Sequence, residues 1–150
     1  MEQDIQLKAV GNLDIVLRDE FGNVKDERHV KNLVVTVGRE YIAARMSEST
    51  PPALMSHMAI GTSTTAVSAS NTALLAQAHR KALTSTTRNS ATVTYAATFN
   101  AGEGTGAITE AGVFNDATTG TMLCRTVFAV VNKSASDSLT INWSVSISAV

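Results

Sequence analysis

The sequence predicts a mainly β fold, an antiparallel β-sandwich with one or two short helices. Hydrophobic residues alternate with polar ones in several short runs separated by turn-forming residues, which is typical of half-buried strands. Charged residues make up 17% of the chain, below the typical value of about 25%, while Ser and Thr are abundant, as in strands with hydroxyl-bearing outer faces. The 150 residues suit a single β-sandwich domain, residues 1–150, with an N-terminal strand region, residues 1–34, that can extend from it.

The N-terminal region predicts three strands in an antiparallel meander. Apolar residues alternate over residues 5–9 and again over residues 13–17, and the Gly-Asn pair between these runs predicts a tight turn. A second turn is expected at residues 19–23, because Gly and Asn tolerate positive φ there. Residues 24–33 then return as the third strand.

Two short helices are predicted in the middle of the chain. Residues 37–46 carry apolar side chains at helical spacing and precede a Pro-Pro pair that cannot continue a helix. Residues 55–60 form a short strand closed by Gly61, and the small polar residues 62–70 predict an exposed, mobile loop. Asn71 is a plausible N-cap for a second helical run over residues 72–77.

The C-terminal half predicts a series of strands. Runs at residues 81–87 and 92–99 are expected to pair across a turn near Asn89-Ser90, and a Gly-rich turn follows at residues 100–106. The last three strands are expected at residues 107–114, 121–131 and 139–147. The final strand alternates most regularly and places Trp143 on its core-facing side, opposite a neutral face of Ser, Thr and Asn.

Charge and hydropathy exclude two classes of partner. The net charge of −1 provides no basic surface of the kind that binds nucleic-acid phosphates, so no nucleic acid is expected. No apolar run reaches the roughly 18 residues that span a bilayer, and the first residues do not resemble a signal peptide. We therefore expect that the protein is made in the cytoplasm and does not associate with a membrane.

The sequence predicts no catalytic, cofactor-binding or metal-binding residues. The Gly-rich segment AGEGTGAITEAG lacks the Lys-Ser/Thr ending of a phosphate-binding loop, and Glu103 would repel a phosphate. His29, His57 and His79 have no second ligand at metal spacing, and Cys124 lies among apolar residues, which predicts a buried thiol. An enzyme is therefore not expected.

One charged residue stands in a strongly apolar context and predicts a structural role. Glu110 lies in ITEAGVF, and a carboxylate buried in a strand needs a partner, which Arg125 on the following strand could supply. Such a pair would fix strand register or an intersubunit contact. Gly112 beside it would let two backbones approach closely, and Phe114 and Phe128 would fill the core.

Several segments resemble small virion structural proteins of tailed bacteriophages. These segments, spread over residues 32–147, are NLVVTVGREYIAARM, MAIGTSTTAVSASNTALLAQ, ITEAGVFN, TMLCRTVFAVVNK and LTINWSVSI. The resemblance implies a mostly β domain that works by assembly as a homotrimer. It also implies structural roles for Gly61 and Thr62 in a turn, for Glu110 to Asn115 in a strand and turn, and for Arg125, Phe128 and Lys133 in the penultimate strand.

The resemblance leaves three functions open, all of them non-enzymatic. The first is a capsid decoration, or cement, protein that binds itself and the major capsid protein on the head surface. The second is a tail component, such as a baseplate, adaptor or fibre-attachment subunit; against it, we expect a fibre protein to continue into a shaft, which this sequence does not contain. The third is a module that binds host carbohydrate, for which one Trp and two Tyr are few aromatic residues. All three place the protein in the virion.

Overall fold

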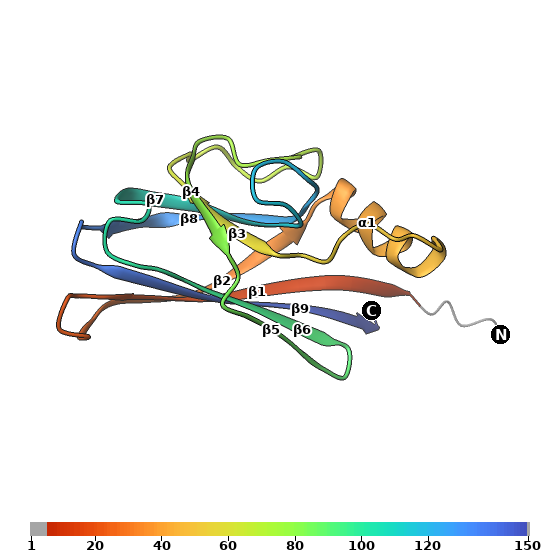
Figure 1. The fold of residues 1–150 in the computed structure, drawn as a ribbon, viewed down its shortest axis with the longest axis horizontal. Coiled ribbons are helices and arrows are strands. Elements are labelled where there is room, and N and C mark those ends of the chain that lie inside the picture. The colour runs from red at the N-terminus through yellow and green to blue at the C-terminus, as the bar shows by residue number, and fades with distance from the viewer. Residues whose placement is uncertain (1–5, 150) are drawn as a thin grey trace.

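The computed structural model describes residues 6–149, which form nine strands and one helix (Figure 1). In chain order the elements are β1 (Leu7–Arg18), β2 (Val24–Val34), α1 (Thr36–Ser47), β3 (His57–Gly61), β4 (Gln77–Ala82), β5 (Ser85–Asn89), β6 (Thr92–Phe99), β7 (Gly106–Phe114), β8 (Met122–Lys133) and β9 (Ser138–Ala149). All strand pairs are antiparallel. The predicted mainly β class with a short helix is confirmed.

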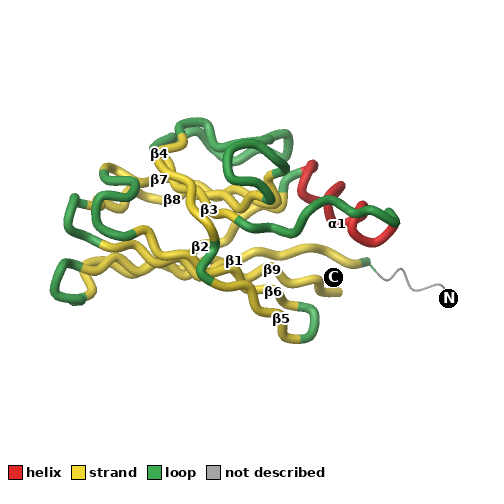
Figure 2. The backbone as a smooth tube through the Cα atoms, in the orientation of Figure 1, coloured by secondary structure: helices red, strands yellow, loops and turns green. Residues whose placement is uncertain are grey.

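The strands form one continuous curled sheet in the order β4-β3-β7-β8-β2-β1-β9-β6-β5. Figures 1 and 2 show two layers, with β3, β7 and β8 lying over β1, β9 and β6. The chain crosses between the layers in β2, which pairs with β1 as far as Asn32 and then with β8 at Leu33 and Val34. The layers therefore belong to one sheet rather than to the two separate sheets of a conventional sandwich.

The two ends of this sheet are also linked by the chain. β4 and β5 stand at opposite ends of the strand order but are separated by only Leu83 and Thr84. The Leu83 N–H donates to the Ser56 carbonyl in one layer, and the Thr84 N–H donates to the Ala96 carbonyl in the other. This connection fixes the curl on the side opposite to β2.

The main core fills the space between the layers. Alternation along β9 buries Leu139, Ile141 and Trp143 completely, because every second side chain of a strand points to the same face. Phe99 from β6 and Ile60 from β3 belong to the same cluster. Trp143 is therefore placed in the core, as its position in the alternation predicts.

Three local predictions differ from the structure. β1 is one strand without a turn at Gly11, because it pairs with β9 without interruption from Leu7 to Arg18. Gly11 instead leaves room for the Asn32 side chain, which a Cβ at this position would strike. Ile5 of the first predicted run lies outside the described residues. Residues 72–77 form no helix, and the predicted 81–87 strand is divided into β4 and β5.

Candidate functional site

The most distinctive polar cluster is a buried ion pair between β7 and β8. Arg125 donates to Oε2 of Glu110 from Nε at 3.0 Å and from Nη2 at 2.8 Å, and both side chains are completely buried. In the β7–β8 register Arg125 lies opposite Gly112, so the guanidinium reaches diagonally to Glu110. The predicted pairing of these two residues is present in the structure.

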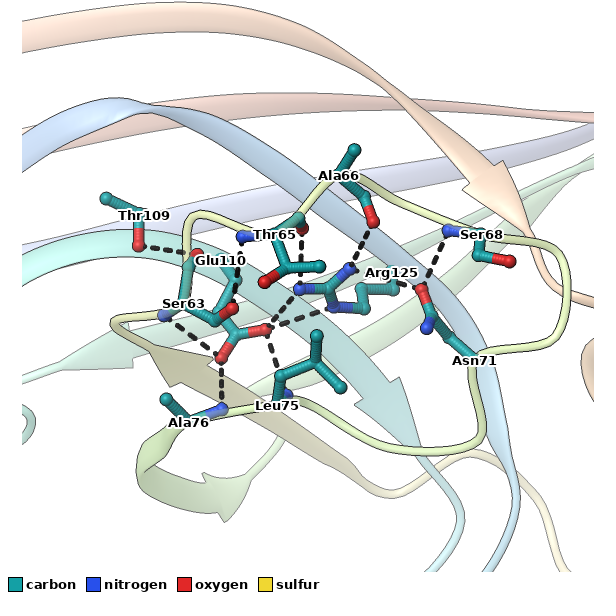
Figure 3. A network of polar contacts seen from close by, with 10 residues as sticks. All are labelled: Ser63, Thr65, Ala66, Ser68, Asn71, Leu75, Ala76, Thr109, Glu110 and Arg125. Carbon is teal, nitrogen blue, oxygen red and sulfur yellow. Dashed lines mark hydrogen bonds and ion pairs between the residues drawn. The ribbon is translucent and has the colours of Figure 1, made fainter.

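The Glu110 carboxylate also holds the main chain of the segment that covers it. We call residues 62–76, which connect β3 to β4, the covering loop. Oε1 of Glu110 accepts hydrogen bonds from the N–H groups of Ala76 at 2.7 Å and Ser63 at 3.4 Å, while Oε2 accepts one from Leu75 at 3.2 Å (Figure 3). Glu110 thus binds both ends of the loop.

Arg125 holds the middle of the covering loop through carbonyl groups. Its Nη2 donates to the Thr65 carbonyl at 3.2 Å, and its Nη1 donates to the Ala66 carbonyl at 3.5 Å and to Oδ1 of Asn71 at 3.1 Å (Figure 3). The same Asn71 oxygen accepts the Ser68 N–H at 2.9 Å. Asn71 is therefore a loop anchor and not the N-cap that its sequence context predicts.

Apolar packing fixes the loop from the same side. Leu74 is buried in a second, smaller cluster with Ala59, Phe114 and Met122, on the side of the β3–β7–β8 layer that faces away from the main core. The Thr36 N–H at the start of α1 donates to the Ala69 carbonyl at 2.8 Å, which ties the loop to the helix. The predicted loop is present, but its backbone is anchored at both ends and in the middle.

The glycines near this cluster have different roles. Gly61 ends β3, and a Cβ there would strike the Ala76 carbonyl and the Glu110 carboxylate. The Thr62 N–H donates to the same Ala76 carbonyl at 2.9 Å. A Cβ on Gly112 would meet side-chain carbons of Leu74 at 3.0 Å and Phe114 at 3.1 Å and, slightly farther away, the main-chain carbonyl of Cys124 at 3.3 Å, so side chains crowd this position in addition to the β8 backbone.

The aromatic site residues divide between two clusters. Phe128 packs in the main core, whereas Phe114 lies in the outer cluster beneath the covering loop. Arg80 places its guanidinium carbon 3.6 Å from the centre of the Phe114 ring, a cation–π contact that no local sequence pattern predicts. Arg80 Nη1 also donates to the carbonyls of Asp116 and Thr119, so it fixes the β7–β8 connection.

Lys133 belongs to a second polar group at the opposite end of β8. It is buried, and desolvation lowers its pKa, while its Nζ donates to the Asn100 carbonyl at 2.9 Å. Nearby, buried Asp137 accepts hydrogen bonds from Lys25 Nζ at 2.8 Å and from the Ser134 N–H at 2.9 Å. These contacts hold the β6–β7 and β8–β9 turns together.

The geometry of the Glu110–Arg125 cluster indicates a structural role for these two side chains. A catalytic carboxylate must reach a substrate, but both Glu110 oxygens face main-chain N–H groups and the guanidinium. Cys124 is also buried, and burial raises its pKa well above the usual value, which keeps the thiol protonated. Glu110 and Arg125 therefore support the covering loop from beneath, and neither they nor Cys124 are exposed at the protein surface.

The described residues contain neither a metal-binding cluster nor a membrane-spanning helix. Among residues 6–149 there is no group of three or more His, Cys, Asp or Glu arranged to hold a metal ion. Within the same range no helix is long and apolar enough to cross a membrane. Comparison with known protein families, with curated proteins and with solved structures finds no match.

Proposed function

We propose that this protein is a structural component of a tailed-phage virion, a capsid decoration protein that self-associates and binds the major capsid protein. The observation that carries the proposal is the use of a fully buried ion pair to fix a surface loop. Glu110 and Arg125 together bind six groups of the covering loop, counting three N–H groups, two carbonyls and the Asn71 side chain. A preorganised surface lowers the entropy cost of binding another protein.

Two further features support an assembly role. The outer faces of β6 and β9 are joined by paired hydroxyl groups, Thr92 with Ser146, Thr94 with Ser144 and Thr98 with Thr140. This face is neutral, so it can rest against another polar surface without burying an unpaired charge. The resemblance of residues 32–147 to virion proteins suggests the kind of assembly, with the homotrimer as the implied oligomer.

A tail component is the second candidate, because the same resemblance includes tail proteins. A carbohydrate-binding module is supported less well. Sugar-binding sites need exposed aromatic rings, and Trp143, Tyr41 and Tyr95 are all buried. The described surface therefore offers no Trp or Tyr ring of this kind for stacking.

Binding to separated virion parts tests the proposal. The purified protein is mixed with DNA-free heads and, separately, with tails of the phage whose genome carries the gene, and bound copies are counted after sedimentation. Saturable binding to heads in a copy number proportional to the capsid subunits is expected. Binding to tails alone, in a small number of copies, would support the tail alternative, and binding to neither would contradict both.

A further inference from the structure

One edge of β1 has no strand partner within residues 6–149. β1 pairs with β9 along its whole length, from Leu7↔Ala149 to Arg18↔Ser138. On the other side its pairing with β2 begins only at Gly11↔Asn32, because β2 turns away to join β8 at Leu33. The edge of residues 7–10 therefore presents main-chain N–H and C=O groups that another strand could pair with.

An apolar groove lies beside this edge. It has a volume of about 440 Å³ and is lined by β1, the end of β2, α1 and the end of β9. Several of its apolar side chains are unusually exposed, with Leu7 at 70%, Met46 at 84% and Ile147 at 39%. Exposed apolar side chains gathered beside an unpaired strand edge would lose contact with water if another chain bound there.

The groove also contains an amide group without a partner. Both Oδ1 and Nδ2 of Asn32 are buried, and neither has a hydrogen-bond partner among the described residues. Asn32 lines the groove at the point where β2 leaves β1. A peptide main chain offers both a donor and an acceptor, and an incoming strand could supply them once the covered Asn32 amide turns toward the groove.

We propose that the occupant is the N-terminal segment of a second copy of this chain, added antiparallel to the free edge of β1. Residues 1–5 have the sequence MEQDI and lead directly into β1. An antiparallel register centred on residue 6 places opposite one another Ile5 and Leu7, Asp4 and Lys8, Gln3 and Ala9, and Glu2 and Val10. The mechanism is strand addition, in which main-chain bonds give affinity and side chains give specificity.

This register is self-complementary in both charge and hydrophobicity. Directly opposite residues of an antiparallel pair lie on the same face, so Ile5 would join Leu7 on the groove side. Asp4 would face Lys8, an attractive pair, and the two-fold symmetry forms each pair twice. The contact goes beyond the proposed function, since it requires only that the chain binds itself, and it predicts a dimer rather than the implied trimer.

Sedimentation equilibrium of the full chain over a concentration series tests this contact. The expected mass is that of two chains. Removal of residues 1–5, Asp4→Lys or Lys8→Asp should each weaken association at least about tenfold, because like charges then face one another or the strand is absent. The double variant Asp4→Lys, Lys8→Asp should restore it. Glu20→Lys, an exposed charge reversal in the β1–β2 turn, is the matched control and should change nothing.

Two results overturn the proposal. One is a mass other than two chains; the other is association that survives both the deletion and the charge reversals. Thermal unfolding of each variant shows whether the monomer is still folded, because none of these changes touches the core. Binding to heads is measured separately, so a monomeric chain that still binds heads would overturn the strand exchange and leave the proposed function standing.

Discussion

Arg125 donates from both Nε and Nη2 to a single oxygen of Glu110, Oε2, at 3.0 Å and 2.8 Å. This arrangement leaves the second oxygen, Oε1, for the N–H groups of Ala76 and Ser63. It also leaves Nη1 and part of Nη2 for loop carbonyls. The pair thus joins β7 to β8 and, with its remaining capacity, joins both strands to the covering loop.

Glu110→Gln should destabilise the protein strongly, because it leaves the Arg125 charge buried without its counter-ion. Breaking one partner of a buried pair costs about 3–5 kcal/mol in the free energy of unfolding. Urea denaturation measures this change. Glu103→Gln is the matched control, since Glu103 pairs with Lys81 near the surface and should cost less than about 1 kcal/mol. Equal effects of the two substitutions would contradict the role assigned to Glu110.

Gly38→Ala and Gly61→Ala should destabilise the protein more than Gly112→Ala. A Cβ on Gly38 would strike the main-chain carbonyl of Leu123, and one on Gly61 would strike the Ala76 carbonyl. These main-chain carbonyls cannot easily move aside, and overpacking typically costs about 1–3 kcal/mol in the free energy of unfolding. At Gly112 the two nearest neighbours are side chains, of Leu74 and Phe114, which can shift, and the Cys124 carbonyl lies farther away at 3.3 Å than the carbonyls that a Cβ would meet at Gly38 and Gly61. Thermal unfolding of the three variants gives the order, and a larger loss at Gly112 would contradict it.

Stability should fall as the pH drops from about 4 to about 2, partly through Asp137. Its hydrogen bonds from Lys25 and from the Ser134 N–H lower its pKa from 3.8 to about 2. Because the folded pKa is the lower one, the stabilisation is complete above 3.8 and is lost as the pH falls through 2. Asp137→Asn should reduce this slope in acid denaturation curves. An unchanged slope would show that the carboxylate does not contribute.

The Cys124 thiol should react with a disulfide reagent only when the protein unfolds. It is fully buried, and its raised pKa disfavours the thiolate that attacks disulfides. The labelling rate in native buffer should therefore increase with urea in step with global unfolding. Fast labelling of the folded protein would show an opening of the sheet near β8.

Alternation was sufficient to predict most strands, because the period of two follows directly from which side chains meet the core. The strand at residues 139–147 is an example. The partner of Glu110 could be predicted for a different reason, because a carboxylate among apolar residues needs a counter-charge. The curl of the sheet could not be predicted, because it depends on β2 and on the Leu83-Thr84 connection pairing with strands far away in sequence.

The covering loop shows a second limit of prediction from sequence. Residues 72–77 have a helix-like composition, but Glu110 binds the N–H groups of Leu75 and Ala76, so tertiary contacts override the local preference. Asn71 resembles an N-cap because it precedes this helix-like run, but its side chain binds Arg125 instead. Nothing in the local sequence near Gly38 shows that the Leu123 carbonyl lies against it.

The most direct test of the account is amide hydrogen exchange of the covering loop in the parent chain and in Glu110→Gln. The N–H groups of Leu75 and Ala76 should be protected in the parent and should lose most of that protection in the variant. The Ile141 N–H, in strand β9 between β1 and β6, should change only as far as global stability changes. Loop amides that exchange freely in the parent, or that stay protected without the Glu110 charge, would contradict the claim that this ion pair fixes the surface.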